Sequence, residues 1–589
     1  MSTPLEELAM IGDGETVALV SRRGSIEWLC LPRFDSPACC ASLVGTEEHG
    51  YWSIAPEARI EHAEHRYRID TLILETDLTT ADGTVRLTDF MPIRSRDPVL
   101  IRIVSGIEGS VPTRLNAAFR FDYGNMPPWL TEIDGGVEMH VGPDKLALHG
   151  SDAFEILDNA AEARFMVEAG DTRAFVLRYR SAHDPDPEPI DPEEALEATG
   201  RYWREWIGRF DDRSEHRQLL LRSLLTLKAL IHRRTGGLVA APTTSLPEQP
   251  GGTMNWDYRY CWLRDATFTL SALVGCGYLE EAAAWRDWIL RAVAGAPDKM
   301  QIMYRVDGSR RLDEAELPWL PGYRFAQPVR VGNAAAGQLQ LDVYGELINT
   351  LHAAERAGME RSDQGRHLEH AIVEHVATVW GRPDQGLWES RGRPRHYTYS
   401  KVMAWVALDR FLAGRGGDEL PEAQRQSMCA LRDHIHDVVC REGFDSGLGS
   451  FTSYFGGQEI DASLLLLPKV GFLPADDERM IGTVRLIEET LVEDGLVRRH
   501  LMNDIVPEGA FIACSFWLAE CQFWQGRHAD AARTVERVLA TGSDLGLLSE
   551  EYDIVSRRLT GNFPQALSHL ALINAFLTMS GADAKADAG

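Results

Sequence analysis

The chain has 589 residues, 44% of them hydrophobic and 25% charged, which is an ordinary composition for a globular protein. At about 100–200 residues per domain, this length predicts two or more domains. The formal net charge of −28 repels phosphate backbones and anionic lipid heads. Nucleic acid and membranes are therefore excluded as expected partners, whereas a neutral ligand such as a sugar is compatible with this charge.

The sequence carries few signs of export or of a metal centre. No apolar run approaches the ~20 residues that span a bilayer, and the first ten residues include Glu6 and Glu7 but no basic stretch. The nine cysteines are scattered, and they show no zinc-type pairing of CxxC motifs. These features predict a cytoplasmic protein with free, buried thiols and no cofactor, although scattered carboxylates leave a structural calcium ion open.

Residues 1–190 show β-like patterns. Asp70–Asp77 and Gly83–Phe90 flank Ala81-Asp82-Gly83, which is typical of a hairpin turn. Many short strands with turn residues between them predict an antiparallel β-sandwich. Further strand-like runs lie at 99–104, 113–121, 163–167 and 174–179.

The pattern then changes. Ala182–Glu194 is rich in proline and acid, and we assign residues 191–214 to a linker. From Arg217 onward, apolar residues recur at three- and four-residue steps and predict ten to twelve helices within 215–585. Paired helices without strands indicate a bundle, a solenoid or a closed barrel, and periodicity alone does not choose among them. The predicted helices lie near 217–233, 264–275, 279–294, 335–356, 366–380, 398–413, 422–440, 476–491, 510–525, 527–540 and 562–580.

Clusters of Trp, Tyr, Arg, Asp and Glu stand in loops just before several of these helices. Aromatic faces stack on sugar rings, and Asp and Arg side chains bind hydroxyls. The cluster at Asn255–Asp265 has both kinds of residue and therefore suits a sugar. The same cluster could instead hold core aromatics and a simple ion pair between Arg264 and Asp265. If the helices form a ring, these loops can share one end of it. The clusters are Asn255–Asp265, Pro318–Tyr323, Pro328–Asn333, Gly386–Ser390 and Pro507–Phe511.

Glycoside hydrolysis requires two carboxyl groups, and two glutamates stand in suggestive surroundings. Glu389 follows Leu387 and Trp388, and burial among apolar neighbours would give it the raised pKa of a general acid. A surface glutamate near a helix start is the simpler alternative. Glu508 precedes the apolar helix at Ala510–Leu518, where it could be either a helix-dipole residue or a base in a cleft.

Taken together and in this order, several long blocks resemble glycoside hydrolase family 15, the group of glucoamylases, glucodextranases and bacterial trehalases. The resemblance covers nearly the whole chain. It implies an N-terminal β-sandwich followed by an (α/α)6 barrel, and an inverting, exo-acting α-glucosidase that releases β-glucose. It also suggests that the first block contributes a loop to the barrel mouth. The blocks are Ile11–Leu43, Asn255–Phe268, Leu320–Glu346, Gly386–Arg410 and Glu508–Glu520.

By motif position, the resemblance implies that Glu389 is the general acid and Glu508 the general base. Arg264 and Asp265 would hold hydroxyls of the terminal glucose. No starch-binding module is evident in the sequence, so small α-glucosides such as trehalose or gluco-oligosaccharides are the expected substrates. Ser390 stands where fungal glucoamylases have a second glutamate, so the residues of the leaving-group subsite stay unassigned. The remaining predicted sugar contacts are Tyr258, Trp262, Trp319, Tyr323, Arg330 and Trp388.

Two other functions fit the same architecture. A disaccharide phosphorylase would use one general acid and let inorganic phosphate attack, so phosphate-dependent release of glucose 1-phosphate would reveal it. A non-catalytic sugar-binding protein would bind sugar tightly without turnover. The presence of both predicted carboxylates favours the hydrolase. A homo-oligomer is compatible with the sequence.

Overall fold

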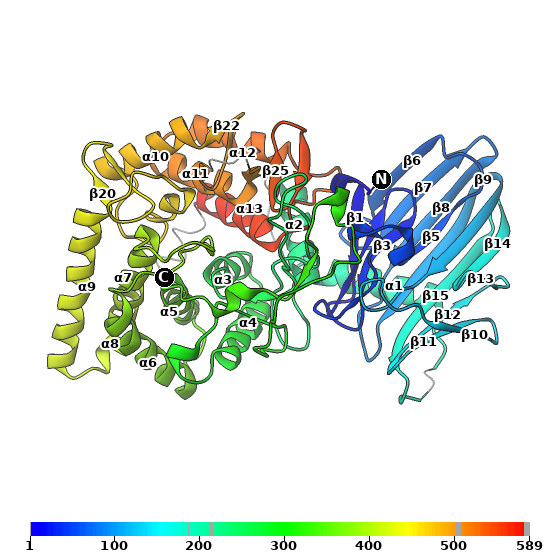
Figure 1. The fold of residues 1–589 in the computed structure, drawn as a ribbon, viewed down its shortest axis with the longest axis horizontal. Helices are drawn as coiled ribbons and strands as arrows, with labels where there is room; N and C mark the ends of the chain where they lie inside the picture. Colours follow the sequence, from blue (N-terminus) through cyan, green and yellow to red (C-terminus); the bar gives the residue numbers. More distant parts are fainter. Residues whose placement is uncertain (1, 186–187, 211–215, 502–507, 582–589) are drawn as a thin grey trace.

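The computed structural model describes residues 2–185, 188–210, 216–501 and 508–581. A β-sheet domain and a helical domain lie side by side (Figure 1). Parts of the predicted segments lie outside these ranges: residues 1 and 186–187 of the N-terminal domain, 211–214 of the linker, 215 and 582–585 of the helical domain, and Pro507 of the last loop cluster. Within the described ranges, none of the helices has the length and hydropathy needed to span a bilayer.

The N-terminal domain is built from antiparallel strand pairs, as predicted. The long strand β9 (Val99–Ala118) belongs to both halves of the sheet: its first part pairs with β8 and β15, and its second with β5 and β14. The predicted hairpin is confirmed, because Thr80 pairs with Gly83 across a two-residue turn. The other strands are β1 (Leu8–Gly12), β2 (Val17–Ser21), β3 (Ser25–Cys30), β4 (Ala38–Cys40), β5 (Tyr51–Pro56), β6 (His62–Tyr67), β7 (Leu74–Thr80), β8 (Gly83–Phe90), β10 (Trp129–Ile133), β11 (Gly136–Val141), β12 (Asp144–Gly150), β13 (Glu155–Leu157), β14 (Ala160–Glu168) and β15 (Thr172–Ser181).

The linker predicted for 191–214 is corrected by helix α1 (Pro192–Ile207), which fills most of it. The Asp191 side chain accepts hydrogen bonds from the first backbone N–H groups of this helix, and proline occupies its first turn. Trp203 and Trp206 are buried. Acidic residues and proline are also typical of linkers, but here they stand at the start of a helix, and its buried Trp206 stacks on Tyr278 of the helical domain.

The helical domain follows the predicted periodicity closely. The helices are α2 (Arg217–Leu230), α3 (Ala266–Gly275), α4 (Leu279–Ala292), α5 (Asp342–Arg356), α6 (Asp363–Val379), α7 (Thr398–Ala413), α8 (Arg415–Asp418), α9 (Glu422–Glu442), α10 (Glu478–Thr490), α11 (Ile512–Trp524), α12 (His528–Leu539) and α13 (Ala566–Met579). Very short strands pair with one another in the loops: β16 (Cys261–Trp262), β17 (Met303–Tyr304), β18 (Ala315–Glu316), β19 (Arg330–Val331), β20 (Phe444–Asp445), β21 (Ser450–Phe451), β22 (Val492–Glu493), β23 (Leu496–Val497), β24 (Ala510–Phe511), β25 (Glu551–Asp553) and β26 (Arg558–Thr560).

The helices form a closed ring, which decides between the three alternatives left by the sequence. In the inner layer, α3 packs on α5, α5 on α7, α7 on the 3₁₀ helix η7 (Ala462–Leu466), η7 on α11, α11 on α13, and α13 back on α3. Helices α2, α4, α6, α9, α10 and α12 lie outside this ring, each against an inner neighbour. This is the (α/α)6 arrangement, with a short 3₁₀ helix in one inner position. Helices α7, α11 and α13 are buried on nearly all faces, because both layers cover them.

Candidate active site

The loop at 255–265 (the 255–265 loop) holds the first group of site residues. Its end forms strand β16, which pairs with β17 and so fixes the backbone of Trp262. The Tyr258 and Trp262 rings meet edge to face, with centroids 5.1 Å apart. Arg264 Nε donates to Asp265 Oδ1 at 3.0 Å, and Asp265 is buried. The structure therefore brings together four predicted sugar contacts.

Glu389 reaches this group from a distant loop. Its Oε1 accepts hydrogen bonds from Trp262 Nε1 at 2.6 Å and from Arg264 Nη1 at 3.3 Å. The Glu389 backbone is in the left-handed region, with φ of 57°, a conformation that is strained for a non-glycine residue and often marks a functional position. Burial raises the pKa of Glu389 despite the attraction of Arg264. A carboxyl group that stays protonated at higher pH is suited to act as a general acid.

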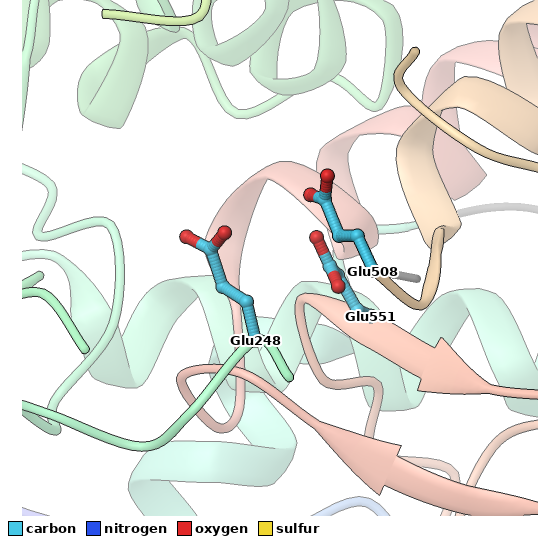
Figure 2. Close-up of side chains that lie close together, drawn as sticks. All are labelled: Glu248, Glu508 and Glu551. Carbon is cyan, nitrogen blue, oxygen red and sulfur yellow. The ribbon is translucent and has the colours of Figure 1, made fainter. Parts of the chain in front are cut away.

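Glu508 lies in a second group with Glu248 and Glu551, called here the glutamate cluster. Figure 2 shows the three side chains converging from separate segments, and one oxygen of each lies within 4.8 Å of the others. The Arg499 guanidinium forms ion pairs with all three: with Glu248 at 2.5 Å, with Glu551 at 3.4 Å, and with Glu508. All three glutamates are buried. Three such carboxylates could hold a metal ion, but Arg499 already supplies a positive charge among them.

Electrostatics divide the cluster into one carboxyl group with a lowered pKa and two with raised pKa values. Burial raises the pKa values of Glu248 and Glu551 well above the ordinary range. Burial also opposes the charge of Glu508, but the attraction of Arg499 outweighs it and the pKa of Glu508 is lowered. The proximity of Glu551 helps to lower the pKa of Glu508 and to raise that of Glu551 itself. Glu508 is thus an available carboxylate at neutral pH.

Sequence reasoning missed Glu550. It is fully buried, its Oε2 accepts a hydrogen bond from the Asn562 backbone N–H at 3.1 Å, and its Oε1 has no partner within the described chain. Tyr258 lies close enough to Glu550 to lower the pKa of that carboxyl, but burial has the larger effect and raises it. Through Tyr258, Glu550 therefore adjoins the Trp262 and Glu389 group. Two adjacent acids after Leu547 and Leu548 were the available signal, but they lie outside every predicted helix.

Trp388 connects the two carboxylate groups. It precedes Glu389 in the chain, and its ring lies 5.6 Å from Phe511 and 5.6 Å from the Arg499 guanidinium, measured to the ring centroids. Its Nε1 donates to Asp461 Oδ1 at 3.3 Å. The Glu389 loop and the glutamate cluster thus lie at one end of the barrel, where we expected the loops to meet.

Three predicted sugar contacts make their polar contacts elsewhere. Trp319 Nε1 donates to the Tyr123 carbonyl at 3.1 Å, and the Tyr323 hydroxyl donates to the Thr3 carbonyl at 3.0 Å, so both side chains bind the β-sheet domain. Arg330 Nη1 donates to the Thr253 carbonyl at 2.9 Å and so supports the segment before the 255–265 loop. Their roles in sugar binding stay predictions.

This arrangement of a β-sheet domain, an (α/α)6 barrel and paired acids at one barrel end is that of a carbohydrate-active enzyme. The sequence profile of the glycosyl hydrolases of family 15 matches residues 214–539, and that of the trehalase-like N-terminal domain matches residues 1–203. The chain belongs to glycosyl hydrolase family 15. It is a glycoside hydrolase, of the type that includes trehalases and glucoamylases.

Individual relatives place the chain more closely within this family. It is 37% identical to a trehalase of Mycobacterium tuberculosis, over 99% of this chain and 91% of the relative. It is 35% identical to a trehalase of Thermoplasma acidophilum, over 94% of this chain and 97% of the relative. A bacterial glucoamylase solved in complex with acarbose has the same fold, with a TM-score of 0.73, 12% identity, and coverage of 99% of this chain and 94% of that one.

Proposed function

We propose that this enzyme is an inverting, exo-acting α-glucoside hydrolase. Trehalose is its first candidate substrate, and small gluco-oligosaccharides are the alternative. One observation carries the proposal: Glu389, with a raised pKa and two donors on one oxygen, adjoins a second group of buried carboxyls that contains an ionised member. Full-length similarity to two trehalases supports trehalose.

In the proposed reaction, Arg264 and Asp265 hold hydroxyls of the terminal glucose. Glu389 gives its proton to the glycosidic oxygen, and Trp262 and Arg264 stabilise the negative charge that Glu389 then acquires. A second carboxylate removes a proton from a water molecule on the opposite face of the sugar. For inversion, the two carboxyl groups stand roughly 6.5–9.5 Å apart to admit that water.

Two glutamates compete for the role of base. The sequence favours Glu508, and its lowered pKa keeps it ionised. Contact with Tyr258 favours Glu550, because that contact joins it to the Glu389 group, and a base whose pKa is raised toward the working pH accepts a proton more readily. Each has one anchored oxygen and one oxygen without a partner in the described chain.

The reaction is tested with trehalose, maltose, isomaltose, kojibiose and dextran, by following released glucose and its anomer by NMR. Inversion of trehalose gives one β-glucose and one α-glucose per event. The same assay with inorganic phosphate separates hydrolysis from phosphorolysis, because only a phosphorylase forms glucose 1-phosphate. Absence of glucose release from every one of these sugars would contradict the proposal and leave a sugar-binding protein.

The acid and the base are assigned with glutamine variants. We expect Glu389→Gln to lower kcat by about 10²–10⁴-fold while the fold is kept, because it cannot donate a proton. Of Glu508→Gln and Glu550→Gln, the variant at the true base should lose a similar factor. Glu248→Gln is the matched control for loss of a buried carboxyl. If all three non-acid variants turn over like the wild type, the base lies elsewhere.

We also propose a cytoplasmic location. Cys39 and Cys40 are adjacent, buried and free, a state that a reducing compartment maintains. Fractionation of cells that produce the tagged full chain tests this, and recovery of the enzyme outside the cytoplasm would contradict it.

A further inference from the structure

A buried polar network joins the β-sheet domain to the 255–265 loop. Arg259 of this loop is 1% exposed. Its Nη2 donates to the Tyr123 hydroxyl at 2.7 Å, and its Nη1 donates to the Ser36 carbonyl at 2.8 Å. Both acceptors belong to the N-terminal domain. A charged side chain is therefore extended out of the barrel and buried in the neighbouring domain, a costly arrangement unless it is fully paired.

The pairing comes from Asp257, two residues earlier. Arg259 binds it through two parallel hydrogen bonds, from Nε to Oδ1 at 2.8 Å and from Nη2 to Oδ2 at 2.7 Å. Asp257 Oδ2 also accepts hydrogen bonds from the Tyr260 hydroxyl at 3.1 Å and from the Gly332 backbone N–H at 3.0 Å. Asp257 thus fixes both the loop and the neighbouring 330–333 segment. Such satisfied networks in a dry interior hold a single geometry.

The β-sheet domain presents Tyr123 in a strained conformation. Asp122 and Tyr123 are successive non-glycine residues in the left-handed region, with φ of 49° and 55°. The Tyr123 backbone is held on both sides, because its N–H donates to the Ala38 carbonyl at 2.9 Å and its carbonyl accepts from Trp319 Nε1 at 3.1 Å. Tyr123 therefore contacts two barrel loops at once. Strain of this kind persists where the surrounding structure requires one position.

Tyr258 stands between the two anchored residues. Its neighbours Asp257 and Arg259 are fixed toward the β-sheet domain and the 330–333 segment, whereas Tyr258 reaches Glu550 and the Trp262 ring. Because the backbone is anchored on both sides of Tyr258, the anchors hold the Tyr258 ring against Trp262, which donates to Glu389.

We propose that Tyr123 is a positioning residue for the active site: through Arg259 and Asp257, the β-sheet domain holds the 255–265 loop in the geometry that catalysis requires. This inference rests on the proposed function, since that function gives the loop its role in holding the sugar. The N-terminal domain is then part of the catalytic unit, although Tyr123 touches neither the sugar nor the reacting carboxyls.

The test compares two variants of the full chain that each weaken the contact between the domains. Tyr123→Phe removes only the hydroxyl that accepts from Arg259. Asp544→Asn is the matched control, because it weakens the ion pair of Asp544 with Arg22 and its hydrogen bond with His65, which join the same two domains. Small displacements at a site cost up to about 10²-fold in rate. We therefore expect Tyr123→Phe to lower kcat/KM by about 5–50-fold, with most of the loss in kcat, and Asp544→Asn to stay within about twofold.

A second measurement does not depend on turnover. Backbone amide hydrogen exchange of residues 255–265 should become faster in Tyr123→Phe and stay unchanged in Asp544→Asn. Arg259→Lys keeps the charge but loses the two-pronged geometry, so it should show the same faster exchange and lower rate as Tyr123→Phe.

The outcomes separate the possible failures. If Tyr123→Phe speeds loop exchange but the wild type hydrolyses no glucoside, the positioning network stands and the proposed function fails. If loop exchange in Tyr123→Phe equals that of the wild type, the positioning role is overturned. If both variants lower kcat/KM equally, the network only joins the domains and the proposal is likewise overturned.

Discussion

Two buried carboxyl groups at one end of the barrel behave in opposite ways. Burial opposes the charge of both Glu389 and Glu508, yet the pKa of Glu389 is raised and that of Glu508 is lowered. Arg264 is the cation beside Glu389, at 3.3 Å, and it also pairs with Asp265. Arg499 pairs directly with Glu508, and the neighbouring Glu551 also helps to lower the pKa of Glu508.

This comparison teaches that burial alone does not assign the acid and the base. Burial favours the neutral form of every carboxyl group, and the nearest cation decides whether that preference is overcome. The pKa of Glu389 stays raised because its cation, Arg264, is shared with Asp265. A general acid needs such a raised pKa. The pKa of Glu508 is lowered because Arg499 pairs with it directly, whereas burial outweighs the attraction of Arg499 at Glu248 and Glu551.

Removal of the cation that Glu508 depends on should have the largest effect. Arg499→Met leaves three buried carboxyls without a positive charge, so we expect the free energy of unfolding to fall by about 3–5 kcal/mol. Urea unfolding followed by tryptophan fluorescence measures this change. Arg527→Met is the matched control, because Arg527 forms its ion pairs with Glu488 and Asp530 at a more exposed position and should lose less than about 1 kcal/mol. Equal losses of unfolding free energy in the two variants would show that Arg499 stabilises the fold no more than a surface arginine does.

A third buried carboxyl, Glu346, sharpens the comparison, because none of the described residues forms an ion pair with it. Glu346 accepts a hydrogen bond from the Tyr399 hydroxyl at 3.0 Å, and burial raises its pKa to about 7 from 4.5. Because the folded state holds this proton more tightly, stability falls as pH rises from about 4.5 to 7, by a total of about 3 kcal/mol. Glu346→Gln should remove that fall, so the variant gains on the wild type across this pH range in urea unfolding. Parallel pH profiles of the two proteins would contradict the assignment.

Trp262→Phe should give the smallest effect and tests what holds Glu389. The lost hydrogen bond from Nε1, 2.6 Å long, stabilises ionised Glu389, so its removal raises the pKa of Glu389 further. The acid must be protonated, so the high-pH limb of kcat/KM should move to higher pH. Loss of the donor should also raise the activation free energy by about 1.5–3 kcal/mol, which lowers the maximum of kcat/KM roughly 10–100-fold.

Trp28→Phe is the control for that experiment. Trp28 Nε1 donates at 2.8 Å to the Pro242 carbonyl, so this variant loses a similar hydrogen bond without touching a carboxylate. It should cost stability and leave the pH limb where it is. A limb that moves equally in both variants would show that the shift does not arise at Glu389.

Local patterns predicted much of the fold. The hairpin at Thr80–Gly83, the helix positions and the change from strands to helices depend on neighbouring residues, and the structure confirms them. The pattern failed in α1, where acid and proline stand at a helix start and not in a linker. It also missed that a 3₁₀ helix replaces one inner helix of the barrel.

The site was predicted less completely. Glu389, Trp262, Arg264 and Asp265 lie together as expected, because they belong to motifs that a sequence displays directly. Glu550 was missed because its partner Tyr258 comes from the other end of the barrel sequence. Trp319 and Tyr323 were expected at the sugar, but their hydrogen bonds go to the β-sheet domain.

By itself, the sequence determined the order of strands and helices, the apolar faces and the chemical types gathered in each loop, because these depend on residues a few positions apart. The tertiary structure alone decided that α13 packs on α3 and closes the ring, that Arg499 forms ion pairs with three glutamates, and that Tyr123 accepts a hydrogen bond from Arg259 of the 255–265 loop. The physical reason is that a pKa or a buried charge depends on everything within a few ångströms, and those neighbours are brought together from distant parts of the chain only by folding.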